Sequence, residues 1–142
     1  LPYMESPCSD DHGGEVGLQG TRPAEVLKLW LGLRQLGIEG IGGVLESALE
    51  RKEMLKRLLG DDHLLVLDGG LHLLALRPRQ NDPAVSASWT EQTRQLLMRQ
   101  GFLLSRPSYD GQHWLKVVLG NPHTTSSHLQ QLAGLISQQL TH

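Results

Sequence analysis

Residues 63–77 read HLLVLDGGLHLLALR, and this stretch decides how the second half of the chain folds. Two short apolar runs, residues 63–67 and 71–77, are separated by Asp68-Gly69-Gly70. Glycine between two such runs is typical of the tight turns that join antiparallel strands, because glycine accepts the backbone angles that these turns need. The stretch therefore predicts a β-hairpin.

A second pair of strands is predicted nearer the C-terminus. Residues 102–108 and 112–119 are short and rich in apolar side chains, and Asp110-Gly111 between them is a strong hairpin signal. Asn121-Pro122 ends the second of these strands. Residues 78–87 contain two prolines and are expected to form a loop.

Apolar residues recur at helical spacing in four other stretches. Gly37 is expected to end the first helix, and Ser88 to begin the third through a capping-box pattern with Glu91. Thr124 or Thr125 is expected to cap the last helix. The four predicted helices cover about residues 21–36, 39–59, 88–100 and 126–140.

This order of elements predicts an α/β fold with about four short, mostly antiparallel strands and helices on one face. The predicted organisation has three parts. Residues 1–20 form an N-terminal arm, residues 21–60 form a connecting helix pair, and residues 61–142 form a small α/β domain.

Composition excludes several classes of protein. The 142 residues carry a formal net charge of −2, which gives no reason to expect nucleic acid or an anionic membrane surface as a partner. The longest apolar runs fall far short of the roughly 20 residues that span a bilayer. The single cysteine, Cys8, cannot form an internal disulfide. The cytoplasm is therefore the expected location.

Two places stand out as candidate sites, while the pattern offers no catalytic residue and no metal ligands. Gly20, Thr21 and Arg22 precede Pro23 at a predicted helix start, where free backbone N–H groups attract anions. The alternative there is a plain helix cap. Lys116 stands in the otherwise apolar strand of residues 114–119, where it either faces solvent or reaches into a site.

Three segments resemble the group II pyridoxal-phosphate (PLP) decarboxylases, which act on amino acids. Residues 19–30, QGTRPAEVLKLW, look like the segment that leads into the family's "LKLW"-type helix. Residues 36–40, LGIEG, are similar to the "LG..G" that follows it, and residues 116–125, KVVLGNPHTT, look like its late strand and "NP.TT" turn. The resemblance covers about residues 15–140.

The resemblance implies the C-terminal portion of a fold-type I PLP enzyme. The family's larger domain holds the cofactor and its Schiff-base lysine, which follows a histidine, and that domain is expected before residue 1. None of the four lysines of this chain follows a histidine, so the chain alone is expected to be inactive. The implied partners are this large domain, a second subunit of a homodimer and an amino-acid substrate.

The resemblance also assigns roles to the two candidate sites. Thr21, with Gly20 and Arg22, matches the position that contacts the cofactor phosphate of the neighbouring subunit. Lys116 matches a position that is usually arginine and reaches the substrate carboxylate. Two rivals stay open: a non-enzymatic α/β interaction module, and a small ligand-binding domain on the same fold.

Overall fold

The computed structural model describes residues 25–60 and 63–140. The chain separates into two compact units, residues 1–42 and 43–142, and each is described by itself. Helix α1 (Glu25–Leu58) begins in the first unit. Among the described residues the second unit adds helices α2 (Pro83–Arg99) and α3 (Ser126–Gln138) and strands β1 (Leu64–Asp68), β2 (Leu73–Pro78), β3 (Ser108–Tyr109), β4 (Gln112–His113) and β5 (Leu115–Val118).

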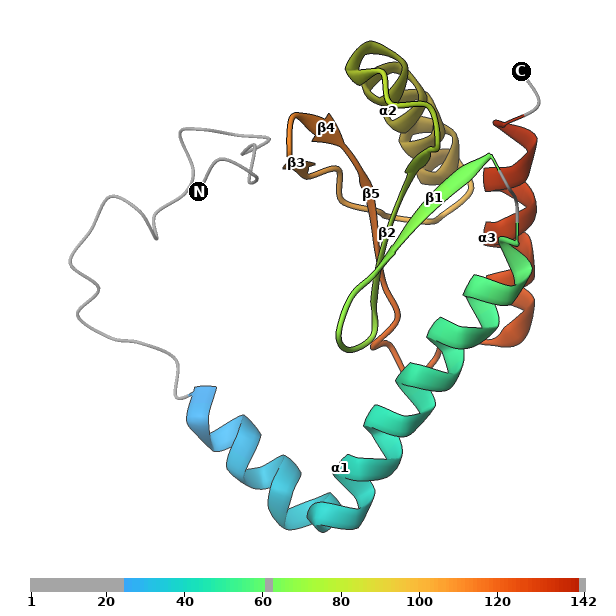
Figure 1. Ribbon diagram of the computed structural model, residues 1–142. Coiled ribbons are helices and arrows are strands. Elements are labelled where there is room, and N and C mark those ends of the chain that lie inside the picture. Colours follow the sequence, from blue (N-terminus) through green and yellow to red (C-terminus); the bar gives the residue numbers. More distant parts are fainter. Residues whose placement is uncertain (1–24, 61–62, 141–142) are drawn as a thin grey trace, which may run out of the picture. The chain divides into compact units, whose positions relative to one another are not determined.

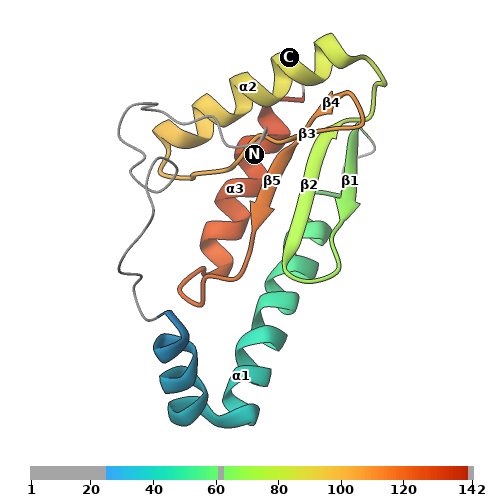
Figure 2. The same cartoon turned by 90° about the vertical axis from the view of Figure 1, so that its left-hand side faces the viewer.

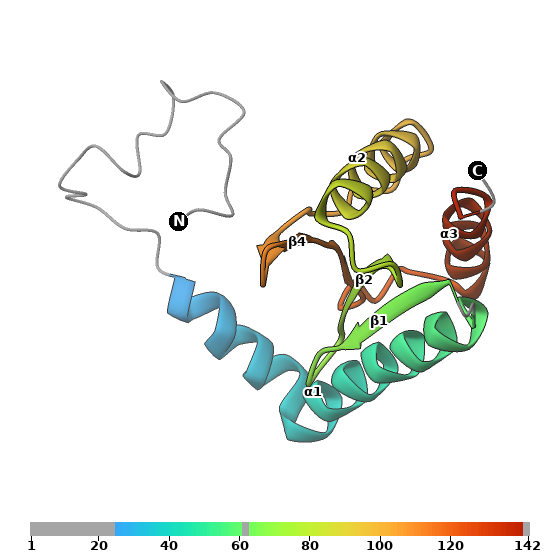
Figure 3. The ribbon, with the colours of Figure 1, turned by 45° about the horizontal axis from the view of Figure 1, so that its top comes forward.

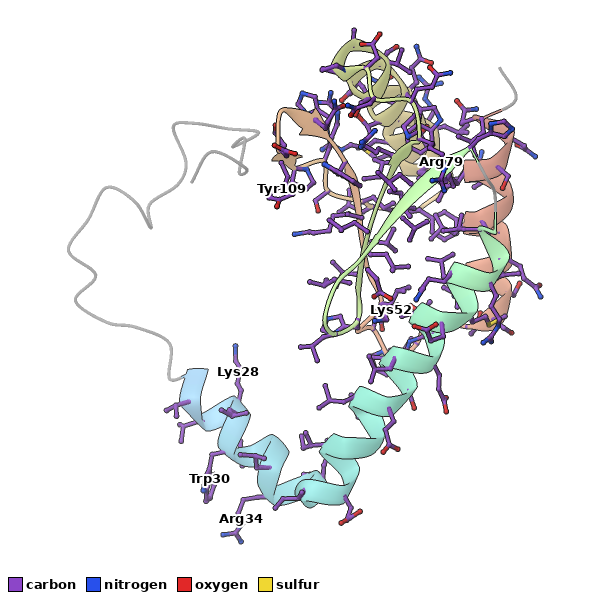
Figure 4. The ribbon with its side chains drawn as sticks, in the orientation of Figure 1. Lys28, Trp30, Arg34, Lys52, Arg79 and Tyr109 are labelled. Carbon is purple, nitrogen blue, oxygen red and sulfur yellow. The ribbon has the colours of Figure 1, made fainter. Side chains whose placement is uncertain are left out.

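In the first unit, α1 is interrupted at Gly37. The glycine has φ 65° and ψ −178°, a left-handed backbone that side chains with a Cβ rarely adopt. The predicted pair of helical runs meeting at Gly37 is therefore confirmed, while the predicted start at Thr21 lies outside the described residues. Arg34 stacks over the ring of Trp30 at 5.1 Å on this stretch (Figure 4).

The second unit is built on a three-stranded antiparallel sheet in the order β1-β2-β5. Figure 2 shows the three strands side by side in this order. The central strand β2 pairs Leu76 with Val66 on one side and with Leu115 on the other. The predicted hairpin of residues 63–77 is thus confirmed, with its turn at Gly69.

Side chains point alternately to the two faces of the sheet along each strand, and helices cover one of these faces. Figures 1 and 3 show α3 and the later part of α1 on the same side of the sheet. Leu55 of α1 and Leu59, just after its end, belong to one buried cluster with Leu132 and Ile136 of α3, and α2 adds Leu97. The sheet adds five residues to this core from one face of its strands: Leu64, Leu74, Leu76, Leu115 and Val117.

The second predicted strand pair differs from the structure. The Asp110-Gly111 turn is present, with φ 52° and 68°, but it joins only the two-residue strands β3 and β4. Residues 102–107 form no strand and meet β5 through the bridge between Ser105 and Lys116. Five short strands stand in the described ranges where about four were expected, and the small antiparallel α/β fold is as predicted.

Helix α2 begins earlier than predicted. Asp82 caps it by accepting a hydrogen bond from the Ala84 N–H at 2.8 Å, and Pro83 occupies the first turn, where its missing N–H costs nothing. Residues 83–87 are therefore helical rather than a loop, and Ser88 is not the cap. The cap of α3 is Thr125, as predicted. The domain boundaries at residues 20 and 60 stay predictions.

Two lysines of α1 hold the turn of the first hairpin. The Lys52 Nζ donates to Asp68 Oδ1 at 2.7 Å and to the Gly69 carbonyl at 3.1 Å, and Lys56 donates to Asp68 Oδ2 at 2.5 Å. Figure 4 shows Lys52 on the sheet-facing side of α1. The hydrogen bonds that Asp68 accepts hold its pKa below the usual value, and the one from Lys52 has a larger effect than the one from Lys56.

Leu76→Ala and Leu73→Ala compare the two faces of the same strand. Leu76 is fully buried, and a leucine-to-alanine change in a core costs about 2–5 kcal/mol. Leu73 is more than one-third exposed, so its replacement should cost clearly less. Urea denaturation measures both free energies of unfolding, and equal losses would contradict this assignment of the core face.

Asp68→Asn should make stability less dependent on pH. Because the pKa of Asp68 is lower in the folded chain, its contribution is complete above the unfolded pKa of about 4 and is lost as the pH falls through the folded pKa. The stability gap between the original chain and Asp68→Asn should therefore close on acidification. Glu53→Gln, which removes only an exposed contact with Lys56, is the control. A stability gap that stays constant down to pH 2 would contradict a stabilising role for the contacts of Asp68 with Lys52 and Lys56.

Candidate functional site

The two predicted sites differ in what the structure says of them. Gly20, Thr21 and Arg22 lie outside the described residues, so their role as an anion site at a helix start stays a prediction. Lys116 lies in β5 and is described fully. The structure therefore addresses one of the two sites and does not bring them together.

Lys116 is half-buried on the sheet face opposite the core. It pairs across the sheet with Ala75, and its backbone N–H donates to the Ser105 carbonyl at 2.8 Å. The side chains of Leu115 and Val117 on either side point into the core. Within residues 25–60 and 63–140, the Lys116 ammonium has no hydrogen-bond or ion-pair partner, so its charge is available to an anion.

A groove of about 770 Å³ lies beside Lys116. It runs along β5 between the segment that follows α2 and the first turn of α3, so all its walls belong to the second unit. Arg94 of α2 is a second cation in its lining, and no Asp or Glu lines it. No sequence pattern pointed to Arg94, since its position depends on how α2, β5 and α3 pack together.

Three backbone donors at the start of α3 already have partners and are not free for the phosphate group of PLP. At the start of α3, where the groove would offer backbone donors, the N–H of Thr125 donates to His128 Nδ1 at 3.2 Å. The N–H of His128 in turn donates to Thr125 Oγ1 at 3.4 Å, and the N–H of Thr124 donates to the Asn121 carbonyl. These donors already have partners within the chain. Of the lysines, Lys52 and Lys56 are held by Asp68.

A buried arginine, missed by sequence reasoning, occupies the same sheet face as Lys116. Arg77 is only 7% exposed and stacks over the Trp114 ring at 5.1 Å. Its guanidinium donates to the carbonyls of Pro78 and Gln80 and to Asn81 Oδ1, while its Nε is buried without a partner. A usable signal existed, because Arg77 and Lys116 interrupt apolar strands and the antiparallel register puts both on one face.

Away from the buried Arg77, the face that carries Lys116 exposes apolar side chains. Leu67 is 48% exposed and Val118 is 54% exposed, and Leu73 lies between them on β2. We call the surface formed by Leu67, Leu73, Lys116 and Val118 the open sheet face. Leucine and valine gathered on one face are typical of surfaces that contact another polypeptide.

Neither a metal site nor a membrane span is found in the part of the chain that the structure describes. No group of three or more His, Cys, Asp or Glu side chains there is placed to hold a metal ion. No helix in the same ranges is both long and apolar enough to cross a bilayer.

Solved structures that share this fold include several decarboxylases. The chain superposes on Oryza sativa TDC, solved with PLP and tryptamine, with a TM-score of 0.71 and 19% identity. It superposes on Catharanthus roseus tryptophan decarboxylase, solved with L-tryptophan, with 0.69 and 18%, and on mouse CSAD in its apo form with 0.65 and 13%. No protein-family model matches the chain, and no curated protein sequence does.

The similarity covers most of this chain and a small part of the others. The superpositions include 81%, 81% and 83% of this chain but only 26%, 26% and 27% of the TDC, tryptophan decarboxylase and CSAD chains. At these identities the comparison shows the fold. The chain thus has the fold of about one quarter of a decarboxylase of this kind.

Proposed function

We propose that this chain is the C-terminal portion of a PLP-dependent L-amino-acid decarboxylase and that it does not catalyse the reaction alone. The observation that carries the proposal is the superposition of most of the chain on about a quarter of several decarboxylases, two of which were solved with PLP or with the amino acid. The three resembling segments support the same family. The cofactor is then bound mainly by a large domain outside the given sequence.

The open sheet face supports a large-domain partner. Leu67, Leu73 and Val118 expose apolar surface on the face that carries Lys116. Burying apolar surface contributes roughly 25 cal/mol per Å², so a domain that covers this face gains stability and excludes water around the lysine. We propose that the large PLP domain packs here.

The assembled enzyme is a homodimer in the cytoplasm.

Lys116 is the proposed contact for the substrate carboxylate. It is half-buried and has no acidic partner among the described residues, so an incoming carboxylate meets an unpaired cation at low solvent exposure. Lysine binds as a point charge and lacks the fork with which arginine holds both carboxylate oxygens. Gly20, Thr21 and Arg22 are the proposed ligands of the cofactor phosphate in the neighbouring subunit.

A second candidate function is a ligand-binding module on the same fold. The groove beside Lys116 favours it, because a cavity of about 770 Å³ within a single compact unit is large enough for a small molecule. This function requires no second domain. A non-enzymatic interaction module that uses the open sheet face is the remaining alternative.

The isolated chain should form no specific covalent adduct with PLP. None of the four lysines follows a histidine, as the family's Schiff-base lysine does, and Lys52 and Lys56 are also engaged by Asp68. The chain is mixed with PLP, reduced with borohydride and analysed by peptide mass spectrometry. Saturable labelling of one lysine would refute the proposal that the cofactor is bound mainly by the large domain. In a second experiment, the chain is joined to the proposed large PLP domain, and carbon dioxide release from L-amino acids is measured.

Thr21→Ala in the complete enzyme should weaken binding of PLP. The change removes one hydrogen bond to a charged group, worth roughly 1.5–3 kcal/mol, so the affinity should fall by about ten- to a hundredfold. Thr125→Ala is the matched control, because it removes a threonine cap at the start of α3 and should cost about 1 kcal/mol of stability without changing cofactor affinity. Titration of the apo-enzyme and thermal unfolding measure the two effects. Unchanged affinity in Thr21→Ala together with lower apo stability would reduce Thr21 to a helix cap.

A further inference from the structure

The groove beside β5 combines an apolar floor with cationic walls. Phe102 and Leu104 from the segment after α2, Val117 from β5 and Leu129 from α3 form much of the apolar lining. Val117 and Leu129 are almost fully buried, so they belong to the core and give the floor a fixed shape. A bound apolar group would lie against these side chains.

Arg94 brings a second unpartnered donor to the groove. Its Nε is buried and forms no hydrogen bond. A buried donor without an acceptor costs roughly 1–3 kcal/mol, and more when the group is charged. Arg106, also in contact with α2, differs in this respect, because its Nε reaches Thr90 Oγ1 at 2.9 Å and Glu91 at 3.6 Å.

The charge of the lining selects an anion. Arg94 and Lys116 are both cationic, and no carboxylate among the lining residues neutralises them. His128 also lines the groove, and its Nδ1 accepts the N–H of Thr125, so the neutral ring carries its proton on Nε2 as a donor. A planar guanidinium matches the geometry of a carboxylate better than it matches a neutral group.

We propose that this groove is a binding site for a small amphipathic carboxylate. The carboxylate pairs with Arg94, assisted by Lys116, and the apolar body lies over Phe102 and Leu129. The volume of about 770 Å³ is within the usual range of roughly 300–1,000 Å³ for small-molecule sites. The inference goes beyond the proposed decarboxylase role, since it concerns the 142-residue chain as it stands. Lys116 is also the proposed substrate contact of the decarboxylase, whereas Arg94 has no role there. The test therefore uses a variant of Arg94.

The experiment titrates the complete 142-residue chain with 3-phenylpropionate and with its neutral counterpart 3-phenylpropanamide. Ligand-observed saturation-transfer NMR gives both dissociation constants. The carboxylate should bind saturably and at least about tenfold more tightly than the amide, as a hydrogen bond to a charged group predicts. Equal affinities, or no saturable binding of the carboxylate, would overturn the proposal.

Arg94→Gln should lower the affinity for 3-phenylpropionate by about ten- to a hundredfold and leave the weak affinity for the amide unchanged. Arg99→Gln is the matched control, because Arg99 is exposed on the last turn of the same helix and does not line the groove. Equal effects of the two variants would show general charge attraction and refute the site. Urea denaturation reports whether Arg94→Gln is folded, and if it is not, Lys116→Gln must show a smaller loss of the same kind.

The outcome is independent of the decarboxylase proposal. A chain that binds 3-phenylpropionate through Arg94 supports the groove site whether or not the joined polypeptides release carbon dioxide. Conversely, an active joined enzyme whose C-terminal chain does not distinguish the acid from the amide would retain the proposed function and reject this inference.

Discussion

The pairing of β2 with β1 on one side and β5 on the other is the constraint on which the second unit depends. It aligns Leu74 and Leu76 with Val117 and Leu115 and turns them toward the helices. Because neighbouring residues of a strand point to opposite faces, the same register sends Lys116 to the open sheet face. A slip of one residue would exchange the two faces, so the core fixes the position of the candidate site.

Local signals predicted local structure well. Gly37, Asp110-Gly111 and Thr125 were each identified from backbone preferences that act within a few residues, and each stands where expected. Residues 102–107 were misassigned because their apolar side chains serve a connection that touches β5 at a single bridge. The start of α2 was misassigned because Asp82-Pro83 occurs equally at turns and at helix caps. Lys116 was found as a charge in an apolar strand, whereas Arg94 depends on tertiary packing.

Charge is distributed unevenly over the second unit. Asp68 forms ion pairs with two lysines. In the described ranges, no carboxylate pairs with Arg77, Arg94 or Lys116. A buried cation is costly unless polar groups replace water around it. Arg77 meets this need with carbonyl oxygens and the Trp114 ring, and only its Nε is left over. The Nε of Arg94 is unpartnered as well, and it lies in a groove that an added anion could enter.

The sheet order also determines when the unit can form during synthesis. Strands β1 and β2 are neighbours in the sequence and close through a short loop, which is a fast, local event. Strand β5 comes from beyond α2, and Arg51 of α1 bonds the Leu119 carbonyl 68 positions later. Closing such long loops costs entropy that is recovered only when the core forms. On the ribosome, one edge of β2 therefore stays without its partner until β5 has emerged, and until then that edge is open to pairing with another chain.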